Sequence, residues 1–132
     1  GLTSQARQYG PVPRAEAVKK QSETQLLLFA KWKTGNEAGW YSGKIYEYLA
    51  AGRPILAVDG RPDVVSELLR ETGAGIDAPD VESVKRELSA MYREYETSGK
   101  VLYHGKLSEI MKYSHVEMTR QFAGLFDSLR KQ

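Results

Sequence analysis

The sequence predicts an α/β fold in which a doubly wound parallel sheet is flanked by helices. Two apolar runs, residues 26–30 and 54–58, are too short for helices and show no polar alternation, which indicates parallel strands covered on both faces. Segments with helix-end signals lie between and after these runs, so strands and helices alternate along the chain. A length of 132 residues with 41% hydrophobic residues fits a single domain over residues 1–132.

The elements in the first half of the chain are predicted from their ends. A first helix is expected over about residues 13–21, before the first strand. Ser42 is placed to cap a helix over residues 42–51, where Gly52 supplies a left-handed stop. This helix would join the two strands as parallel neighbours. A shorter helix is expected from residue 62 or 63 to residue 70, and a short edge strand within residues 72–77.

Two longer helices are predicted in the second half, each with one apolar face. Asp80 is placed to cap the first, and we expect its apolar residues to face the core, because they recur at steps of three and four: Val81, Val84, Leu88, Met91, Tyr92 and Tyr95. Ser114 and Glu117 form a capping-box pair that opens a closing helix over about residues 114–130. Its apolar stripe needs a surface to dock on and consists of Met118, Phe122, Leu125, Phe126 and Leu129.

Composition excludes several classes of function. The 19 Lys and Arg residues against 17 Asp and Glu residues lack the basic surplus that nucleic-acid binding requires, so no nucleic-acid partner is expected. With no cysteine, the chain has no disulfide or thiol nucleophile, which is compatible with the cytoplasmic location we expect. No apolar run approaches the ~20 residues of a membrane span. His104 and His115 are not spaced as metal ligands, so neither a metal site nor a cofactor is expected.

Two polar, glycine-containing segments, residues 31–41 and 98–107, are expected to be mobile loops. The first follows a strand of the sheet, and loops at the carboxyl ends of parallel strands are where such sheets bind ligands. The aromatic residues around this loop are expected to anchor it by packing, with stacking on a ligand as the alternative: Trp32, Trp40 and Tyr41.

The start of the helix at Ser42 is a candidate anion site. Gly43-Lys44 lacks the rest of a P-loop, because Ala38 stands where the motif needs its first glycine and Ile45 where it needs serine or threonine. The free N–H groups and the positive dipole end of the helix still favour an anion such as phosphate. The alternative is an ordinary capped helix with a solvated lysine.

Glu47 lies on the second turn of this helix, on the same face as Lys44. A solvent-exposed ion pair is one interpretation of this residue. The other is a carboxylate that accepts two hydrogen bonds from a ribose diol, as acidic residues do in dinucleotide-binding sheets.

One segment resembles a known family. Residues 42–56, Ser-Gly-Lys-Ile-Tyr-Glu-Tyr-Leu-Ala-Ala-Gly-Arg-Pro-Ile-Leu, resemble the nucleotide-sugar site of group 1 glycosyltransferases, the retaining enzymes of GT-B fold. Residues 9–13 look like the base-proximal loop of that family, and residues 26–30 look like its next strand. Tyr113-Ser114 looks like the start of its closing helix, so the resemblance covers almost the whole chain.

The resemblance implies that the chain is the distal part of the C-terminal donor-binding domain, one Rossmann-like half of a GT-B fold. It places the donor diphosphate on the backbone N–H groups of Ser42, Gly43, Lys44 and Ile45. Glu47 would bind the ribose hydroxyls, and Gly10 and Val12 would lie near the base. The parent enzyme would transfer a sugar from a nucleotide diphosphate sugar to an acceptor with retention, by stabilising the departing diphosphate. No catalytic residue is assigned.

Two departures from the family limit this assignment. Many relatives carry a glutamate where Gly39 stands, with Glu37 only nearby, so the sugar contact of that position is open. The chain also has the length of one domain, whereas a GT-B enzyme has two. We therefore expect a fragment that binds nucleotide poorly, transfers no sugar alone and associates weakly with itself through its closing helix. The N-terminal acceptor domain, with any peripheral membrane contact of the parent, would lie outside it.

Two other functions fit the same residues. A nucleotide-sugar epimerase of the same architecture would need acid and base groups from the other half of the protein. A non-catalytic α/β interaction module would use the aromatic loop residues instead. Nucleotide binding would separate the interaction module from both enzymes.

Overall fold

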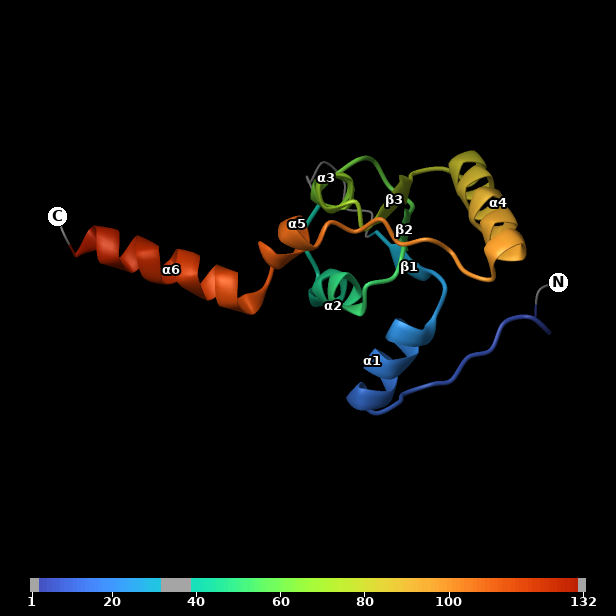
Figure 1. Cartoon of the computed structure of the whole chain (residues 1–132), viewed down its shortest axis with the longest axis horizontal. Helices are drawn as coiled ribbons and strands as arrows, with labels where there is room; N and C mark the ends of the chain where they lie inside the picture. Colours follow the sequence, from blue (N-terminus) through green and yellow to red (C-terminus); the bar gives the residue numbers. More distant parts are fainter. Residues whose placement is uncertain (1–2, 32–38, 131–132) are drawn as a thin grey trace.

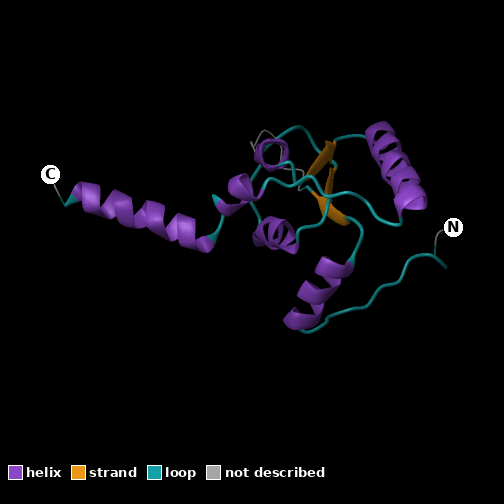
Figure 2. Ribbon diagram, in the orientation of Figure 1, coloured by secondary structure: helices purple, strands orange, loops and turns teal. Residues whose placement is uncertain are grey.

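The computed structural model describes residues 3–31 and 39–130 (Figure 1). Its centre is a three-stranded parallel sheet in the order β1-β2-β3, formed by β1 (Leu27–Ala30), β2 (Ile55–Val58) and β3 (Gly75–Ala78). Helices surround this sheet (Figure 2). The α/β class and the parallel pairing of the two apolar runs are therefore confirmed.

Six helices occur among the described residues. They are α1 (Arg14–Glu23), α2 (Gly43–Ala51), α3 (Val64–Thr72), α4 (Val81–Ser98), α5 (Leu107–Met111) and α6 (His115–Leu129). The five predicted helices are confirmed with shifts of a few residues at their ends. The short helix α5 follows the loop expected at residues 98–107 and was not predicted. No described helix is both long and apolar enough to cross a bilayer.

The strands differ in how fully they are covered. In the central strand β2, Ile55, Leu56 and Ala57 are completely buried, as predicted. In β1 the residues alternate, and Leu28 is 59% exposed. The expectation that both runs are covered on two faces is thus wrong for β1. The physical reason is its position, since β1 is an outer strand and the helices cover one of its faces.

The hydrophobic core lies between the sheet and helices α2 and α3. Its edge-on ring contact joins Phe29 of β1 to Tyr48 of α2, with centroids 6.3 Å apart. Residues 103–113, which include α5, pack against the same core through Tyr103, Ile110 and Tyr113. The buried residues of this cluster are Leu27, Phe29, Ile45, Leu49, Ile55, Ala57, Val65, Leu68, Leu69 and Ala74.

Most helix ends follow the predicted signals, but the predicted cap by the Ser42 side chain is not found, because Ser42 makes no capping hydrogen bond among the described residues. Gly52 ends α2 in the left-handed conformation, with φ of 62°. Asp63 and Asp80 cap α3 and α4 by accepting hydrogen bonds from first-turn N–H groups, and a serine three residues on completes each capping box. The Ser114 side chain accepts a hydrogen bond from the Glu117 N–H at the start of α6. Local capping chemistry therefore sets these boundaries.

The apolar stripe of α4 does not face the core, so that prediction is wrong. Val81, Leu88, Tyr92 and Tyr95 are exposed, and the buried residue of this helix is Ser83. Figure 1 shows α4 on the side of the sheet opposite α2 and α3, and α4 covers little of the sheet, because Leu28 of β1 and Ile76 of β3 remain exposed. Periodicity shows which face of a helix is apolar, but it does not show whether another element covers that face.

Helix α6 extends away from the rest of the molecule (Figure 1, red). Its stripe residues Phe122, Leu125, Phe126 and Leu129 are between 56% and 63% exposed. The apolar face that needs a docking surface is therefore present, and within this chain it remains open to solvent.

Candidate functional site

A pocket of about 350 Å³ lies at the carboxyl end of β1, between the first turns of α2 and α3. This is the edge of a parallel sheet where ligands bind in α/β proteins. Two of the residues predicted to hold a diphosphate, Ser42 and Lys44, line it. The full lining is Leu28, Phe29, Ala30, Lys31, Gly39, Trp40, Ser42, Lys44, Asp63 and Val65.

Gly43 is the first residue of α2 and leaves the helix start accessible. A Cβ atom built on Gly43 would meet no atom of the described residues within 4 Å. The N–H groups of the first turn have no partner within a helix, so Gly43 and Lys44 present donors at this open end. The Ser42 side chain makes no capping hydrogen bond within the described part of the chain. The geometry is suited to an approaching anion.

Ile45 differs from Gly43 and Lys44, because it faces the core and not the open side of this turn. Its side chain is fully buried in the core, and its N–H donates to the Ser42 carbonyl oxygen at 3.1 Å. An anion would have to share this N–H with the carbonyl group. Ile45 therefore anchors the start of α2, while Gly43 and Lys44 face the open side.

Glu47 forms an ion pair with a residue that sequence reasoning did not identify. Arg14 Nη2 donates to Glu47 Oε1 at 3.1 Å, which links α1 to α2. The Arg14 side chain is 82% exposed. Exposed ion pairs of this kind contribute little free energy, so Glu47 can exchange Arg14 for a ligand hydroxyl. Because Arg14 and Glu47 are 33 positions apart in the sequence, local sequence patterns do not reveal this ion pair.

Gly10 and Val12 lie in the segment that leads into α1 and do not belong to the lining of the pocket at β1. Gly10 has a φ of 68°, which favours glycine. Arg14, the first residue of α1, joins the end of this segment to α2 through its ion pair with Glu47.

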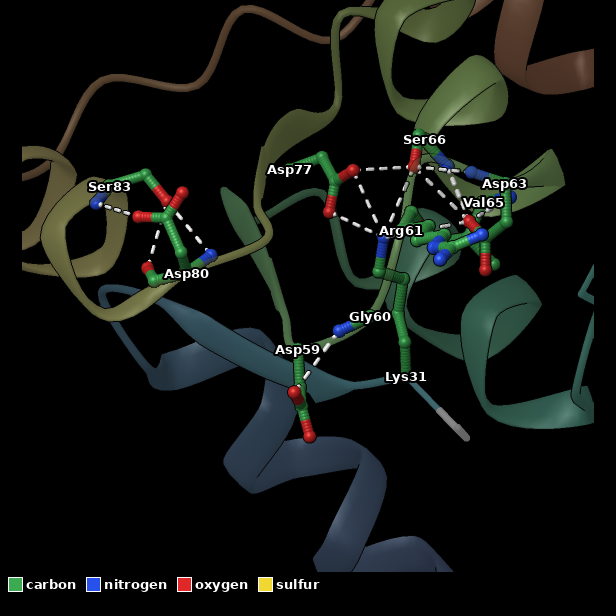
Figure 3. A network of polar contacts seen from close by, with 10 residues as sticks. All are labelled: Lys31, Asp59, Gly60, Arg61, Asp63, Val65, Ser66, Asp77, Asp80 and Ser83. Atoms are coloured by element: carbon green, nitrogen blue, oxygen red, sulfur yellow. Dashed lines mark hydrogen bonds and ion pairs between the residues drawn. The ribbon is translucent and has the colours of Figure 1, made fainter. Parts of the chain in front are cut away.

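A buried lysine organises the edge of the sheet beside the pocket (Figure 3). Lys31 is 6% exposed, and its Nζ donates to the Arg61 carbonyl oxygen at 2.9 Å and to Asp77 Oδ2 at 3.0 Å. Nζ also lies 2.8 Å from Asp77 Oδ1. Ser66 Oγ in turn donates to Asp77 Oδ2. The network ties the ends of β1 and β3 to the start of α3, although the sequence suggested only a loop at Lys31.

Gly39 packs directly against Asp63. A Cβ atom at Gly39 would lie 2.6 Å from Asp63 Oδ2, and the φ of Gly39 is 80°. A side chain is excluded here by both contact and backbone conformation. The carboxyl group of Asp63 therefore fills the space that a side chain at position 39 would need. Trp32, Glu37 and Ala38 lie outside the described residues.

The aromatic residues after the loop are partly anchored. The Tyr41 ring lies 6.0 Å from Tyr46 and 6.3 Å from Tyr113, centroid to centroid, as packing predicts. Burial raises the pKa of Tyr41 above its usual value. The Tyr113 hydroxyl donates to Glu71, and burial together with that carboxylate raises the pKa of Tyr113. Trp40 remains 55% exposed and lines the pocket.

The two histidines are exposed, and no group of three or more His, Asp or Glu side chains among residues 3–31 and 39–130 is arranged to hold a metal ion.

Comparison of the chain with protein-family models, with curated proteins and with solved structures gives no match. The argument for a function therefore rests on the pocket, the first turn of α2 and the residues around them.

Proposed function

We propose that this chain is the distal part of the donor-binding domain of a retaining GT-B glycosyltransferase, and that it binds a nucleotide diphosphate sugar. The observation that carries the proposal is the open first turn of α2, where Gly43 leaves room for a ligand at the carboxyl end of β1. The resemblance of residues 42–56 to the nucleotide-sugar site of group 1 glycosyltransferases supports it.

The proposed site acts by electrostatics. The N–H groups of Gly43 and Lys44 would bind the diphosphate, and the Lys44 ammonium group would add a positive charge. As the sugar leaves, negative charge grows on the diphosphate, and fixed N–H dipoles stabilise that charge without reorganising. Glu47 would release Arg14 and accept hydrogen bonds from the ribose hydroxyls.

Titration calorimetry with UDP, GDP and ADP tests this proposal. We expect at least one of these nucleotides to bind, and we expect Gly43→Val to weaken that binding at least tenfold, because its side chain would occupy the diphosphate position. Gly124→Val in α6 is a matched control. A Cβ atom on either helical glycine meets no described atom within 4 Å, so neither valine side chain should clash with the rest of the protein.

Two results would contradict the proposal. The first is the absence of binding for all three nucleotides, which would favour a non-catalytic interaction module. The second is an unchanged affinity in Gly43→Val, which would mean that the diphosphate binds elsewhere.

A further inference from the structure

The pocket at the carboxyl end of β1 has two chemically different walls. On the side of α2, the first turn of the helix presents N–H donors and the ammonium group of Lys44. On the side of α3, the lining group is the carboxylate of Asp63. A carboxylate repels phosphate and accepts hydrogen bonds without donating any. The part of a ligand that lies against Asp63 is therefore a hydrogen-bond donor and not a phosphate.

The two carboxylate oxygens of Asp63 have different surroundings (Figure 3). Oδ1 accepts hydrogen bonds from the N–H groups of Val65 and Ser66, each at 3.1 Å, and thereby caps α3. Oδ2 accepts no hydrogen bond from residues 3–31 and 39–130. It lies beside Gly39, where a Cβ atom would be only 2.6 Å away. Both residues line the pocket, so the cap holds Oδ2 in place as an acceptor at the pocket wall.

The position of Glu47 distinguishes the two ends of the proposed ligand. A nucleotide diphosphate sugar carries its nucleoside on one side of the diphosphate and its sugar on the other. Glu47, the proposed ribose acceptor, pairs with Arg14 of α1 and does not belong to the lining of this pocket. With the diphosphate at the start of α2, the nucleoside then lies toward α1 and the sugar lies in the pocket. The donors that a sugar offers to Asp63 Oδ2 are its hydroxyl groups.

We propose that Asp63 is a specificity-determining residue for the donor, and that its Oδ2 accepts a hydrogen bond from a hydroxyl group of the sugar. This inference rests on the proposed function and extends it from the diphosphate to the sugar. Trp40 supports it, because this residue is 55% exposed on the same pocket and supplies an apolar surface for the C–H groups of a sugar ring. A few fixed polar groups beside aromatic surface are typical of small-molecule sites.

NMR chemical-shift titrations of the isotope-labelled chain test this inference. The ligands are UDP, GDP and ADP, each compared with a sugar derivative: UDP-glucose, GDP-mannose and ADP-glucose. Asp63→Ser removes Oδ2 but keeps a side-chain oxygen that can cap α3. We expect this variant to bind the nucleotide sugar at least tenfold more weakly, because a hydrogen bond to a charged acceptor is lost. The affinity for the matching nucleoside diphosphate should change less than twofold, because its contacts lie on α2.

Asp80→Ser is the matched control, because Asp80 caps α4 in the same way and does not line the pocket. It should leave both affinities unchanged. If the nucleoside diphosphate binds and Asp63→Ser leaves the affinity for its sugar derivative unchanged, the role of Asp63 is overturned and the proposed function stands. An equal loss for both ligands would also overturn it, since Asp63 would then act through the fold of α3. The absence of binding for every ligand would overturn the proposed function, and this inference with it.

Deoxy analogues of the bound nucleotide sugar separate a hydroxyl contact from a structural effect. In the original chain, the analogue that lacks the contacted hydroxyl should bind at least tenfold more weakly than the complete sugar. In Asp63→Ser, the same analogue and the complete sugar should bind equally, because the acceptor is absent. If every deoxy analogue loses the same affinity in both chains, Asp63 contacts no sugar hydroxyl and the inference is overturned.

Discussion

Glu47 is the residue whose two interpretations differ most in their consequences. If it binds a ribose diol, Glu47→Gln should lower the affinity for ribonucleoside diphosphates by about 1–3 kcal/mol, because a charged acceptor is lost. The affinity for deoxyribonucleotides should fall less. Titration calorimetry measures both values.

Arg14→Ala is the matched variant for this measurement, because it removes the ion pair and leaves the Glu47 carboxylate in place. An exposed pair contributes at most about 1 kcal/mol to stability, so this variant should fold normally. An equal loss of affinity for both sugars in Glu47→Gln would assign Glu47 to the ion pair with Arg14 alone.

Lys31 is the residue on which the pocket edge depends most. Lys31→Met should reduce the free energy of unfolding by about 3–5 kcal/mol, because it leaves the carboxylate of Asp77 inside the protein without its cation. Urea denaturation measures this loss. Lys44→Met is the control, since Lys44 is an exposed lysine on the same pocket and its replacement should change stability by less than about 0.5 kcal/mol.

A double variant shows whether the loss of stability in Lys31→Met comes from the unpaired carboxylate of Asp77 or from lost packing of the lysine side chain. Adding Asp77→Leu to Lys31→Met removes both charges and should recover part of the lost stability. If the double variant is less stable than Lys31→Met, Asp77 stabilises the fold without the lysine, through the hydrogen bond that it accepts from Ser66.

At the scale of elements, α4 should respond to acid through Asp80, the residue that caps its start. Hydrogen bonds from Ser83 lower the pKa of Asp80 below its reference value of 3.8. A carboxyl group whose pKa is lower in the folded state stabilises that state above the unfolded pKa, and this stabilisation is lost as pH falls through the folded pKa. The start of α4 should therefore loosen below about pH 4.

Hydrogen exchange of the α4 amides between pH 5 and pH 2 would follow this change. Asp80→Asn keeps a capping acceptor without a titratable group, so its first turn should vary less with pH. The same response in both chains would show that other acids control the end of this helix.

The exposed stripe of α4 shows what a helix needs besides periodicity. The pattern at Val81, Leu88 and Tyr92 identified an apolar face correctly, yet these residues remain exposed. An apolar groove of about 280 Å³ lies between this helix, Leu26 and Val101. Which surface covers a helix depends on parts of the molecule that the local pattern does not contain.

At the scale of the whole molecule, the proposal separates binding from catalysis. In a GT-B enzyme the reaction takes place between two domains, so one domain can bind the donor without an acceptor site. We expect this chain to bind a nucleotide diphosphate and to transfer no sugar. An assay of sugar release with radiolabelled donors checks this expectation. Transfer by the 132-residue chain alone would contradict the assignment as one half of the enzyme.

Sequence predicted the features that are determined within a few residues. The cap at Asp80, the left-handed stop at Gly52 and the parallel pairing of two apolar runs follow from local chemistry, and all are confirmed. The contact of Lys31 with Asp77 joins residues on different strands, and no periodicity indicates it. The first turn of α2 was located from sequence, whereas the pocket beside it also required the position of α3.

The order of the strands in the sheet has a consequence for folding during translation. Leu27 pairs with Ile55, and Ile55 pairs with Gly75, so each strand joins one that was synthesised shortly before it. Ribosomes add about 5–20 residues per second, whereas short loops close within microseconds. Each strand can therefore find its partner as it emerges, and the three strands can be assembled while α6 is still being translated.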